Sequence, residues 1–290
     1  MTARKIVVVT GCSSGFGKLL TESLLERGHR VFAGVRSQKD LRAELGPDAI
    51  ALDVTSDASV AAAFAAIREK TDRIDVLVNN AGVSAMGVAE GFTPAQLSSL
   101  LDVNLLGAHR LCRAALPLMR AAGSGLLVFV STGLARMPMP CFGPYAASKA
   151  AVEALAEAFR YELMPSGIET VIVEPGPYPT SLGSNALAPD DADRVAAYGP
   201  LAVLPAKMME GLSAWFSSPG SPDAKEVPEA ITKLIEAPRG TRPLRLVVGG
   251  TGSALTELNA LTDRLQAQAL ASQGLDALLK LESWPESGSV

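Results

Sequence analysis

The sequence, 290 residues long, is poor in the residues that build disulfide frameworks and metal sites. It has only three cysteines, Cys12, Cys112 and Cys141, which are far apart and odd in number, and this argues against both kinds of site. The two histidines, His29 and His109, have no histidine, cysteine or carboxylate neighbour at a metal-ligand spacing. We therefore expect no metal, and a reducing compartment such as the cytoplasm.

The chain also lacks an excess of positive charge and a long apolar run near its start. Lysine and arginine number 26 against 30 acidic residues, which excludes the basic footprint of a nucleic-acid-binding protein. The apolar run at residues 6–9 is too short for a signal sequence or a membrane span. We expect a cytoplasmic protein with no nucleic-acid partner and no membrane span.

What the sequence does contain is a repeated alternation of short apolar runs and helical patterns. Strands are predicted at residues 6–10, 30–35, 48–54, 74–79, 125–131, 169–174 and 244–248, and helices at residues 19–27, 59–70, 96–122 and 145–164. The first strand shows no polar alternation, as in a parallel sheet buried on both faces. The alternation predicts an α/β fold with a doubly wound parallel sheet, whose ligands bind beyond the carboxyl ends of the strands.

A single domain is predicted for residues 1–250. Residues 181–227 interrupt the alternation, because they contain no strand pattern and mix proline, glycine, methionine and aromatic residues; we interpret them as a substrate-binding lid. Residues 251–290 are predicted to form a helical extension, helix-prone as far as Leu281 and frayed from residue 283 on.

A glycine-rich loop follows the first predicted strand and leads into a helix. Glycine lets the backbone approach a pyrophosphate, and the free N–H groups at a helix start bind it. The spacing is G-x-x-x-G-x-G, which an ordinary glycine-rich turn could also show, and the strand-loop-helix context favours a dinucleotide site. The predicted cofactor-binding residues of this loop are Gly11, Ser13, Ser14, Gly15, Phe16 and Gly17.

The end of the second predicted strand bears on the choice of cofactor. A dinucleotide site usually has an Asp or Glu there, which bonds the ribose 2′-hydroxyl of NAD. Here the segment reads Ala33-Gly34-Val35-Arg36, with no carboxylate. Because the Arg36 guanidinium can form two hydrogen bonds to a 2′-phosphate, NADP(H) is predicted over NAD(H). The alternative is that Arg36 is a solvated surface charge.

A tyrosine and a lysine, Tyr145 and Lys149, stand four residues apart at the start of a predicted helix, so they share one face. A neighbouring ammonium favours the phenolate, so we expect Lys149 to lower the pKa of Tyr145 and to let it exchange a proton at physiological pH. By itself the pattern is common by chance.

In combination, the motifs resemble the short-chain dehydrogenase/reductase superfamily. They are the glycine loop, Asn79-Asn80-Ala81-Gly82, Asn104, Tyr145-x-x-x-Lys149 and Pro175-Gly176, in one order on one β/α frame. The resemblance extends from about Lys5 to Gly249. It implies a single-domain Rossmann fold with a seven-stranded sheet in the order 3-2-1-4-5-6-7 and helices on both faces.

The resemblance also implies roles for particular residues. Around a bound cofactor it places Gly11, Ser14, Phe16 and Gly17 at the pyrophosphate, Asp53 and Val54 at the adenine, Asn80, Ala81 and Gly82 along the adenosine, Lys149 at the nicotinamide ribose, and Pro175, Gly176 and Thr180 at the carboxamide. Asn104 matches an asparagine that anchors a water in the proton relay.

One position departs from the family pattern. Where the family usually has a serine that hydrogen-bonds the substrate oxygen, the spacing to Tyr145 selects Thr132, with Ser131 next to it. Successive side chains of a strand point to opposite faces, so only one of the two hydroxyls is expected in the site. We assign the catalytic role to Thr132, which completes a predicted set of Asn104, Thr132, Tyr145 and Lys149.

Apolar residues near these groups predict a lipophilic substrate. The candidates are Leu134, Met139, Phe142 and Tyr178, although ordinary core packing explains such residues equally well. Similarity to the hydroxysteroid and retinol dehydrogenase branch favours a lipophilic ketone, aldehyde or secondary alcohol. The leading hypothesis is an NADP(H)-dependent oxidoreductase; the alternatives are a specific hydroxysteroid-like or biosynthetic ketoreductase, and a non-catalytic NADP sensor. The Ala and Leu stripes of residues 97–122 and 146–163 predict a homodimer or homotetramer.

Overall fold

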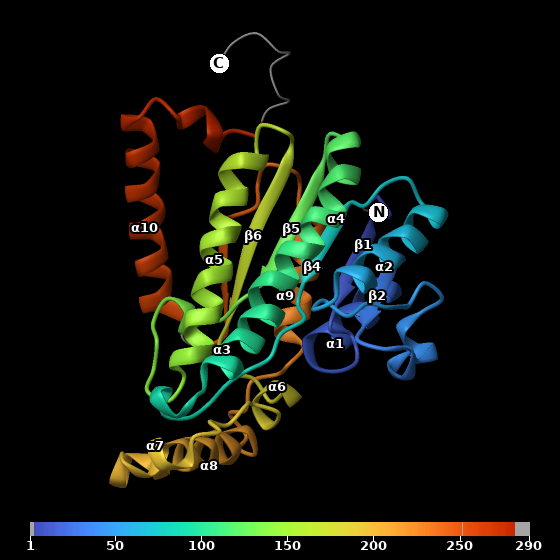
Figure 1. Cartoon of the computed structure of the whole chain (residues 1–290). Helices are drawn as coiled ribbons and strands as arrows, with labels where there is room; N and C mark the ends of the chain where they lie inside the picture. Colours follow the sequence, from blue (N-terminus) through green and yellow to red (C-terminus); the bar gives the residue numbers. More distant parts are fainter. Residues whose placement is uncertain (1–2, 251, 282–290) are drawn as a thin grey trace.

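The computed structural model describes residues 3–250 and 252–281, and its centre is a seven-stranded parallel sheet (Figure 1). The strands are β1 (Ile6–Thr10), β2 (Arg30–Val35), β3 (Ile50–Ala51), β4 (Val76–Asn79), β5 (Gly125–Val130), β6 (Ile168–Pro175) and β7 (Arg245–Val248). Their order is β3-β2-β1-β4-β5-β6-β7, which confirms the predicted fold class and strand order. The order reverses between β1 and β4, which is where such sheets bind ligands.

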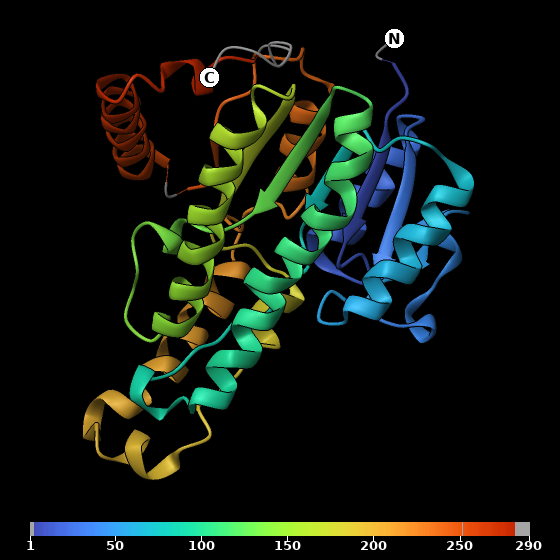
Figure 2. The ribbon, with the colours of Figure 1, turned by 45° about the horizontal axis from the view of Figure 1, so that its top comes forward.

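Helices cover both faces of the sheet (Figures 1 and 2). The main ones are α1 (Gly15–Glu26), α2 (Asp57–Lys70), α4 (Ala108–Ala121), α5 (Gly143–Leu163) and α9 (Glu226–Glu236). Alternate strand residues feed two cores: Val8, Leu77 and Phe129 pack with α2, α4 and α5, whereas Val7, Val78 and Val128 pack with α1 and α9. The unbroken apolar runs seen in the sequence therefore reflect strands buried on both sides.

Two predicted elements differ in the structure. The third strand, predicted over residues 48–54, has only two paired residues, Ile50 and Ala51, which pair with the last two residues of β2. The long helix predicted over residues 96–122 is divided into α3 (Pro94–Leu101), a π-helical turn (Asp102–Gly107) and α4. A Cβ atom on Gly107 would lie only 2.8 Å from Cγ2 of Val54, so this turn packs closely on the segment after β3.

Residues 181–227 contain no strand of the sheet, as predicted, and they are largely helical. They form α6 (Ser181–Ser184), α7 (Ala192–Ala196), a 3₁₀ helix (Gly199–Val203) and α8 (Leu204–Phe216). Figures 1 and 2 both show α7 and α8 extending away from the sheet. A bridge between Ala85 and Leu187 ties this excursion to the segment after β4.

The C-terminal extension consists of α10 (Gly252–Ser272) and a 3₁₀ helix (Asp276–Leu279). α10 lies beside α5, where Gln266 hydrogen-bonds both Glu157 and Tyr161. The frayed end predicted from residue 283 lies outside the described residues. Of the helices in residues 3–250 and 252–281, none is long and apolar enough to cross a membrane.

Candidate active site

The glycine loop lies between the carboxyl end of β1 and the start of α1. Gly11 (φ +71°) and Gly15 (φ +55°) adopt the left-handed backbone region, which side chains disfavour. Gly17 is required for space instead, because a Cβ atom there would overlap the carbonyl oxygen of Gly11. Three glycines of the motif are therefore explained by conformation or by close packing.

The first turn of α1 is suited to an anion. Ser14 occupies the N-cap position, yet its side chain forms no capping hydrogen bond, and no acidic residue lies in the first turn. Because no side chain caps this helix, its first backbone N–H groups and the positive end of its dipole are available to bind an anion. The cradle fits the pyrophosphate of a dinucleotide.

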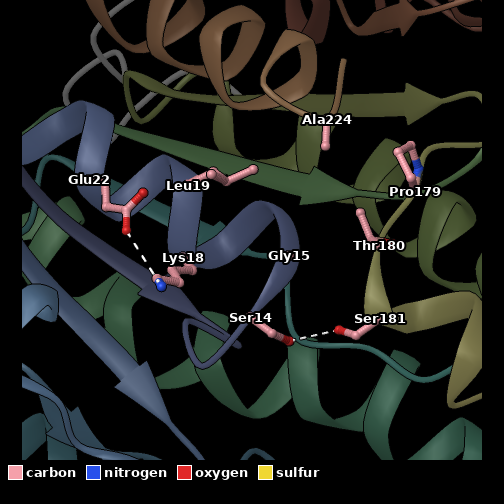
Figure 3. A pocket seen from close by; sticks show the side chains of 9 residues that line it. All are labelled: Ser14, Gly15, Lys18, Leu19, Glu22, Pro179, Thr180, Ser181 and Ala224. Atoms are coloured by element: carbon pink, nitrogen blue, oxygen red, sulfur yellow. Dashed lines mark hydrogen bonds and ion pairs between the residues drawn. The ribbon is translucent and has the colours of Figure 1, made fainter. Parts of the chain in front are cut away.

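The segment after β6 lies against this loop (Figure 3). The hydroxyl oxygens of Ser14 and Ser181 are 2.9 Å apart, and Thr180 is 3.7 Å from the position of a Cβ atom on Gly15. Together with Lys18 and Ala224 these residues line a pocket of about 320 Å³. The predicted carboxamide-binding segment is thus adjacent to the predicted pyrophosphate loop, and Gly176 is fixed by its N–H bond to Val248.

The end of β4 is bonded directly to the glycine loop. The Thr10 hydroxyl accepts hydrogen bonds from the N–H groups of Asn80 and Ala81, and the Asn80 side chain donates to the Thr10 carbonyl at 2.8 Å. A Cβ atom on Gly11 would be 2.9 Å from Cα of Ala81. The two motifs therefore form one rigid unit at the point where the strand order reverses.

The ends of β2 and β3 lie on the other side of the loop. Arg36 follows β2 and is exposed, and within the described part of the chain its guanidinium forms no ion pair within 4 Å. Asp53 accepts hydrogen bonds from the backbone and hydroxyl of Thr55, which lower the pKa of its carboxyl group. The carboxylate is thus ionised and fixed where the resemblance places an adenine.

Tyr145 and Lys149 lie in the first turns of α5 and are both buried. The Lys149 ammonium donates to the Val130 carbonyl at the end of β5, over 2.8 Å. A Cβ atom on Gly82 would be 3.4 Å from Nζ of Lys149 and 3.3 Å from Oδ1 of Asn104, so these three residues converge on one point. Glycine at position 82 keeps that point open.

The predicted electrostatic effect of Lys149 on Tyr145 does not appear. Burial raises the pKa of Tyr145, because a desolvated phenolate is costly, and burial lowers the pKa of Lys149 to about 8. The expectation of a lowered tyrosine pKa was wrong because spacing along a helix does not reveal desolvation. A neutral phenol is nevertheless the form that can donate a proton.

Asn104 occupies the π-helical turn and is fully hydrogen-bonded. Its Oδ1 accepts from the Val83 N–H at 2.9 Å, and its Nδ2 donates to the Val83 carbonyl and to the Ser148 hydroxyl, each at 2.9 Å. π-helical turns are frequent at functional sites. The asparagine joins α5 to the segment after β4, next to Lys149.

The structure separates the two hydroxyls at the end of β5. Ser131 is buried and donates to Glu153 at 2.5 Å, away from Tyr145. The Thr132 hydroxyl accepts a hydrogen bond from the Leu134 N–H, which leaves its own proton available. This geometry favours Thr132 as the site hydroxyl.

The proposed substrate residues fall into two groups. Leu134 and Phe142 pack in the small apolar cluster that contains Tyr145. Met139 is 52% exposed and lies outside that cluster. Tyr178 packs edge-on against Phe16 in the α1/α9 core, and its hydroxyl donates to Glu226. Tyr178 is therefore a packing residue within the loop after β6, and its contact with substrate stays a prediction.

Some residues of the site were missed from the sequence. Val83 packs in the Tyr145 cluster, and Ser148 bonds Asn104 and the Tyr145 carbonyl. Ser148 lies within the Tyr145-to-Lys149 motif and could have been found there. Leu187 belongs to the segment interpreted as a lid and also packs in the Tyr145 cluster, where the bridge to Ala85 brings it near. Among the described residues no group of three His, Cys, Asp or Glu side chains could hold a metal.

The fold, the glycine loop and the Tyr145–Lys149 pair define a nicotinamide-type dehydrogenase architecture. The family model for short chain dehydrogenases matches residues 5–190, and the chain belongs to the short-chain dehydrogenase/reductase family. This confirms the resemblance inferred from the motifs.

Two curated relatives and two solved structures illustrate the similarity. A 3-ketodihydrosphingosine reductase of Bacteroides thetaiotaomicron is 36% identical over 62% of this chain and 66% of its own length, and mouse retinol dehydrogenase 7 is 36% identical over 62% and 58%. The chain thus spans less than two thirds of either relative. A short-chain dehydrogenase from Streptomyces avermitilis superposes with a TM-score of 0.76 at 30% identity, covering 94% of this chain and 97% of that one. One from Burkholderia cenocepacia, in complex with NADP, gives 0.67 at 27% identity, covering 96% and 99%.

Proposed function

We propose that the protein is an NADP(H)-dependent oxidoreductase that interconverts a carbonyl group and an alcohol. The observation that carries this proposal is the convergence of Asn104 and Lys149 at Gly82, beside buried Tyr145 and next to an uncapped helix start. Bound at the carboxyl ends of the strands, the nicotinamide cofactor supplies or accepts hydride. The residues of the chain then supply the proton and the orientation.

Each residue has a distinct task in the proposed reaction. In reduction, Oη of Tyr145 donates its proton to the substrate oxygen as that oxygen gains negative charge, and in oxidation it takes the proton back. The Thr132 hydroxyl donates a hydrogen bond to the same oxygen. The Lys149 ammonium has three N–H donors and gives one to Val130, so the others remain for the cofactor ribose. Asn104, in the π-helical turn, anchors the water of the proton relay in this proposal.

A substrate panel tests the activity directly. Lipophilic ketones, aldehydes and secondary alcohols are incubated with the protein, and absorbance of the reduced cofactor is followed with NADPH and then with NADH. Leu134, Phe142 and Leu187 around Tyr145 favour apolar substrates, in line with the names of the reductase and retinol dehydrogenase relatives. Failure to consume or form reduced cofactor with every compound would instead favour the non-catalytic sensor.

Cofactor choice is proposed to depend on Arg36. Replacing it by alanine removes a charge-assisted contact to a 2′-phosphate, so the Kd for NADPH is expected to rise about 10- to 100-fold. The Kd for NADH, which has no such phosphate, is expected to change little. Fluorescence titrations of wild type and R36A with both cofactors measure the two ratios, and equal effects on both would contradict the assignment.

Thr132 is proposed to orient the substrate oxygen. Thr132→Val keeps the shape of the side chain and removes the hydroxyl, so kcat is expected to fall about 100-fold. Thr132→Ser keeps the hydroxyl and serves as the matched control, with most of the activity retained. Steady-state kinetics on both variants decide the point, and a T132V variant with wild-type activity would show that another group orients the substrate oxygen.

Homo-oligomerisation through the α4 and α5 faces also stays a prediction, which analytical sedimentation would test.

A further inference from the structure

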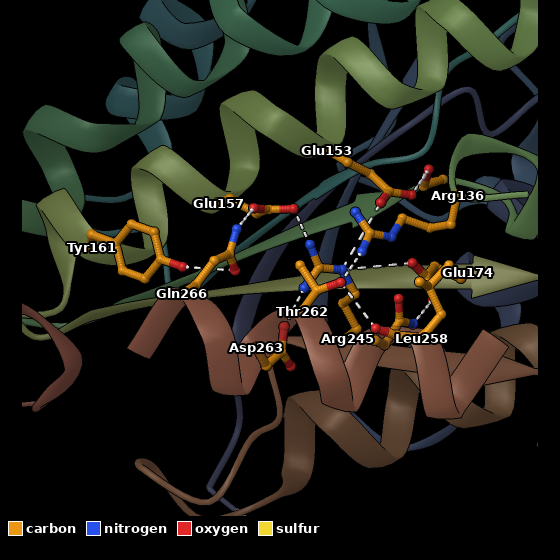
Figure 4. A network of polar contacts seen from close by, with 12 residues as sticks. Arg136, Glu153, Glu157, Tyr161, Glu174, Arg245, Leu258, Thr262, Asp263 and Gln266 are labelled. Atoms are coloured by element: carbon orange, nitrogen blue, oxygen red, sulfur yellow. Dashed lines mark hydrogen bonds and ion pairs between the residues drawn. The ribbon is translucent and has the colours of Figure 1, made fainter. Parts of the chain in front are cut away.

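A largely buried network of charges lies between α5, β6, β7 and α10 (Figure 4). At its centre is Arg245 of β7, which forms ion pairs with Glu157 of α5 and Asp263 of α10. Its Nε is 4.0 Å from Oε2 of Glu153 and 3.7 Å from Oε1 of Glu174, and in the described part of the chain none of these three buried atoms has a hydrogen-bond partner. None of these groups takes part in the proposed chemistry.

Glu153 connects this network to the site. It follows Lys149 by one helical turn, and the two side chains bind successive residues at the end of β5: Lys149 binds the carbonyl of Val130, and Glu153 accepts from the hydroxyl of Ser131. Ser131 in turn directly precedes Thr132. Two neighbouring side chains of α5 therefore hold the end of β5, just before Thr132, whose hydroxyl is proposed to bind the substrate oxygen.

The same carboxylate acts electrostatically on Lys149. Burial lowers the pKa of Lys149 to about 8, and the charge of Glu153 opposes that fall. The groups around Glu153 are Ser131 and Arg136 after β5, Lys149 and Glu157 on α5, Glu174 on β6, Arg245 on β7, and Asn259 and Asp263 on α10. Burial raises the pKa of Glu153, whereas Ser131 and the nearby cations oppose that rise.

We propose that Glu153 is a positioning residue of the active site, which holds Ser131 and faces Lys149 while Arg245 and α10 keep its carboxylate in place. α10 contributes at several points: Asn259 donates to Glu174, Asp263 pairs with Arg245, and Thr262 accepts from Arg136. The C-terminal extension, none of whose described side chains lies in the proposed site, thereby supports it. The effects of Glu153 on kcat and kcat/KM rest on the proposed function, whereas its effect on NADPH affinity can be measured without turnover.

The decisive variant is Glu153→Gln, which keeps an acceptor for Ser131 and removes the charge. Without that charge the ammonium form of Lys149 is less stable, so its pKa falls further. Steps that need the ammonium are then lost at lower pH, and the alkaline decline of both NADPH affinity and kcat/KM is expected to move down by about one pH unit. Glu157→Gln is the matched control, because Glu157 shares Arg245 but does not contact Ser131; no shift is expected there.

A second variant, Ser131→Ala, leaves the charge cluster intact and removes only the bond to Glu153. It is expected to lower kcat about 3- to 10-fold without moving the alkaline decline of the pH profile. Fluorescence titrations with NADPH across pH, which need no turnover, separate this proposal from the proposed activity. A folded E153Q with the wild-type pH dependence of affinity, an equal shift in E157Q, or an S131A with unchanged kcat would overturn the proposal.

Discussion

Replacing Tyr145 by phenylalanine is expected to lower kcat by about 10²- to 10⁴-fold, the contribution of a positioned general acid. The ring remains in its apolar cluster with Leu134 and Phe142, so only the phenolic hydroxyl, the proton donor, is lost. The phenol forms no hydrogen bond within the described residues, so its loss leaves no partner unsatisfied. Single-turnover and steady-state kinetics with the best substrate of the panel measure the effect.

The control for this variant is cofactor binding. Tyr145→Phe should bind NADPH with nearly the wild-type Kd and unfold at nearly the wild-type temperature, because neither the glycine loop nor Lys149 is altered. Turnover at the wild-type rate would refute Tyr145 as the proton donor. A parallel loss of NADPH binding would show that the substitution damaged the site and not the chemistry.

The second large effect is expected from Gly17→Ala. The added methyl group would overlap the carbonyl oxygen of Gly11 and lie close to the Asn80 side chain, so the loop must move away from its bonds with β4. Overpacking of this kind weakens a site by about 1–3 kcal/mol, and we expect NADPH to bind about 10- to 100-fold more weakly. Fluorescence titration measures the change in Kd.

Gly250→Ala is the matched control for that experiment. No heavy atom lies within 4 Å of a Cβ atom on Gly250, and its φ is not in the left-handed region, so the same chemical change should cost little. Comparable weakening in both variants would mean that the Gly17 packing is not what forms the cradle.

Sequence patterns sufficed where a local rule decides the structure. The two-sided apolar runs predicted the sheet, and the order of motifs predicted its topology and family. They failed where distant packing decides: the close approach of Gly107 to Val54 accompanies the break in the helix predicted over residues 96–122. The same limit applies to the pKa of Tyr145, because burial comes from the whole fold and not from the spacing to Lys149.

The joining of the glycine loop to the end of β4 also bears on how the chain acquires its site. The Thr10 hydroxyl donates to the carbonyl of Val78, 68 positions along the chain, and accepts from Asn80 and Ala81 just beyond it. Closing so long a segment costs entropy before any contact is gained, and such long-range pairing slows folding. Competence to bind a dinucleotide should therefore arise late during refolding, after β1 and β4 have paired, and a cofactor that binds this joint would act as a clamp on the finished sheet.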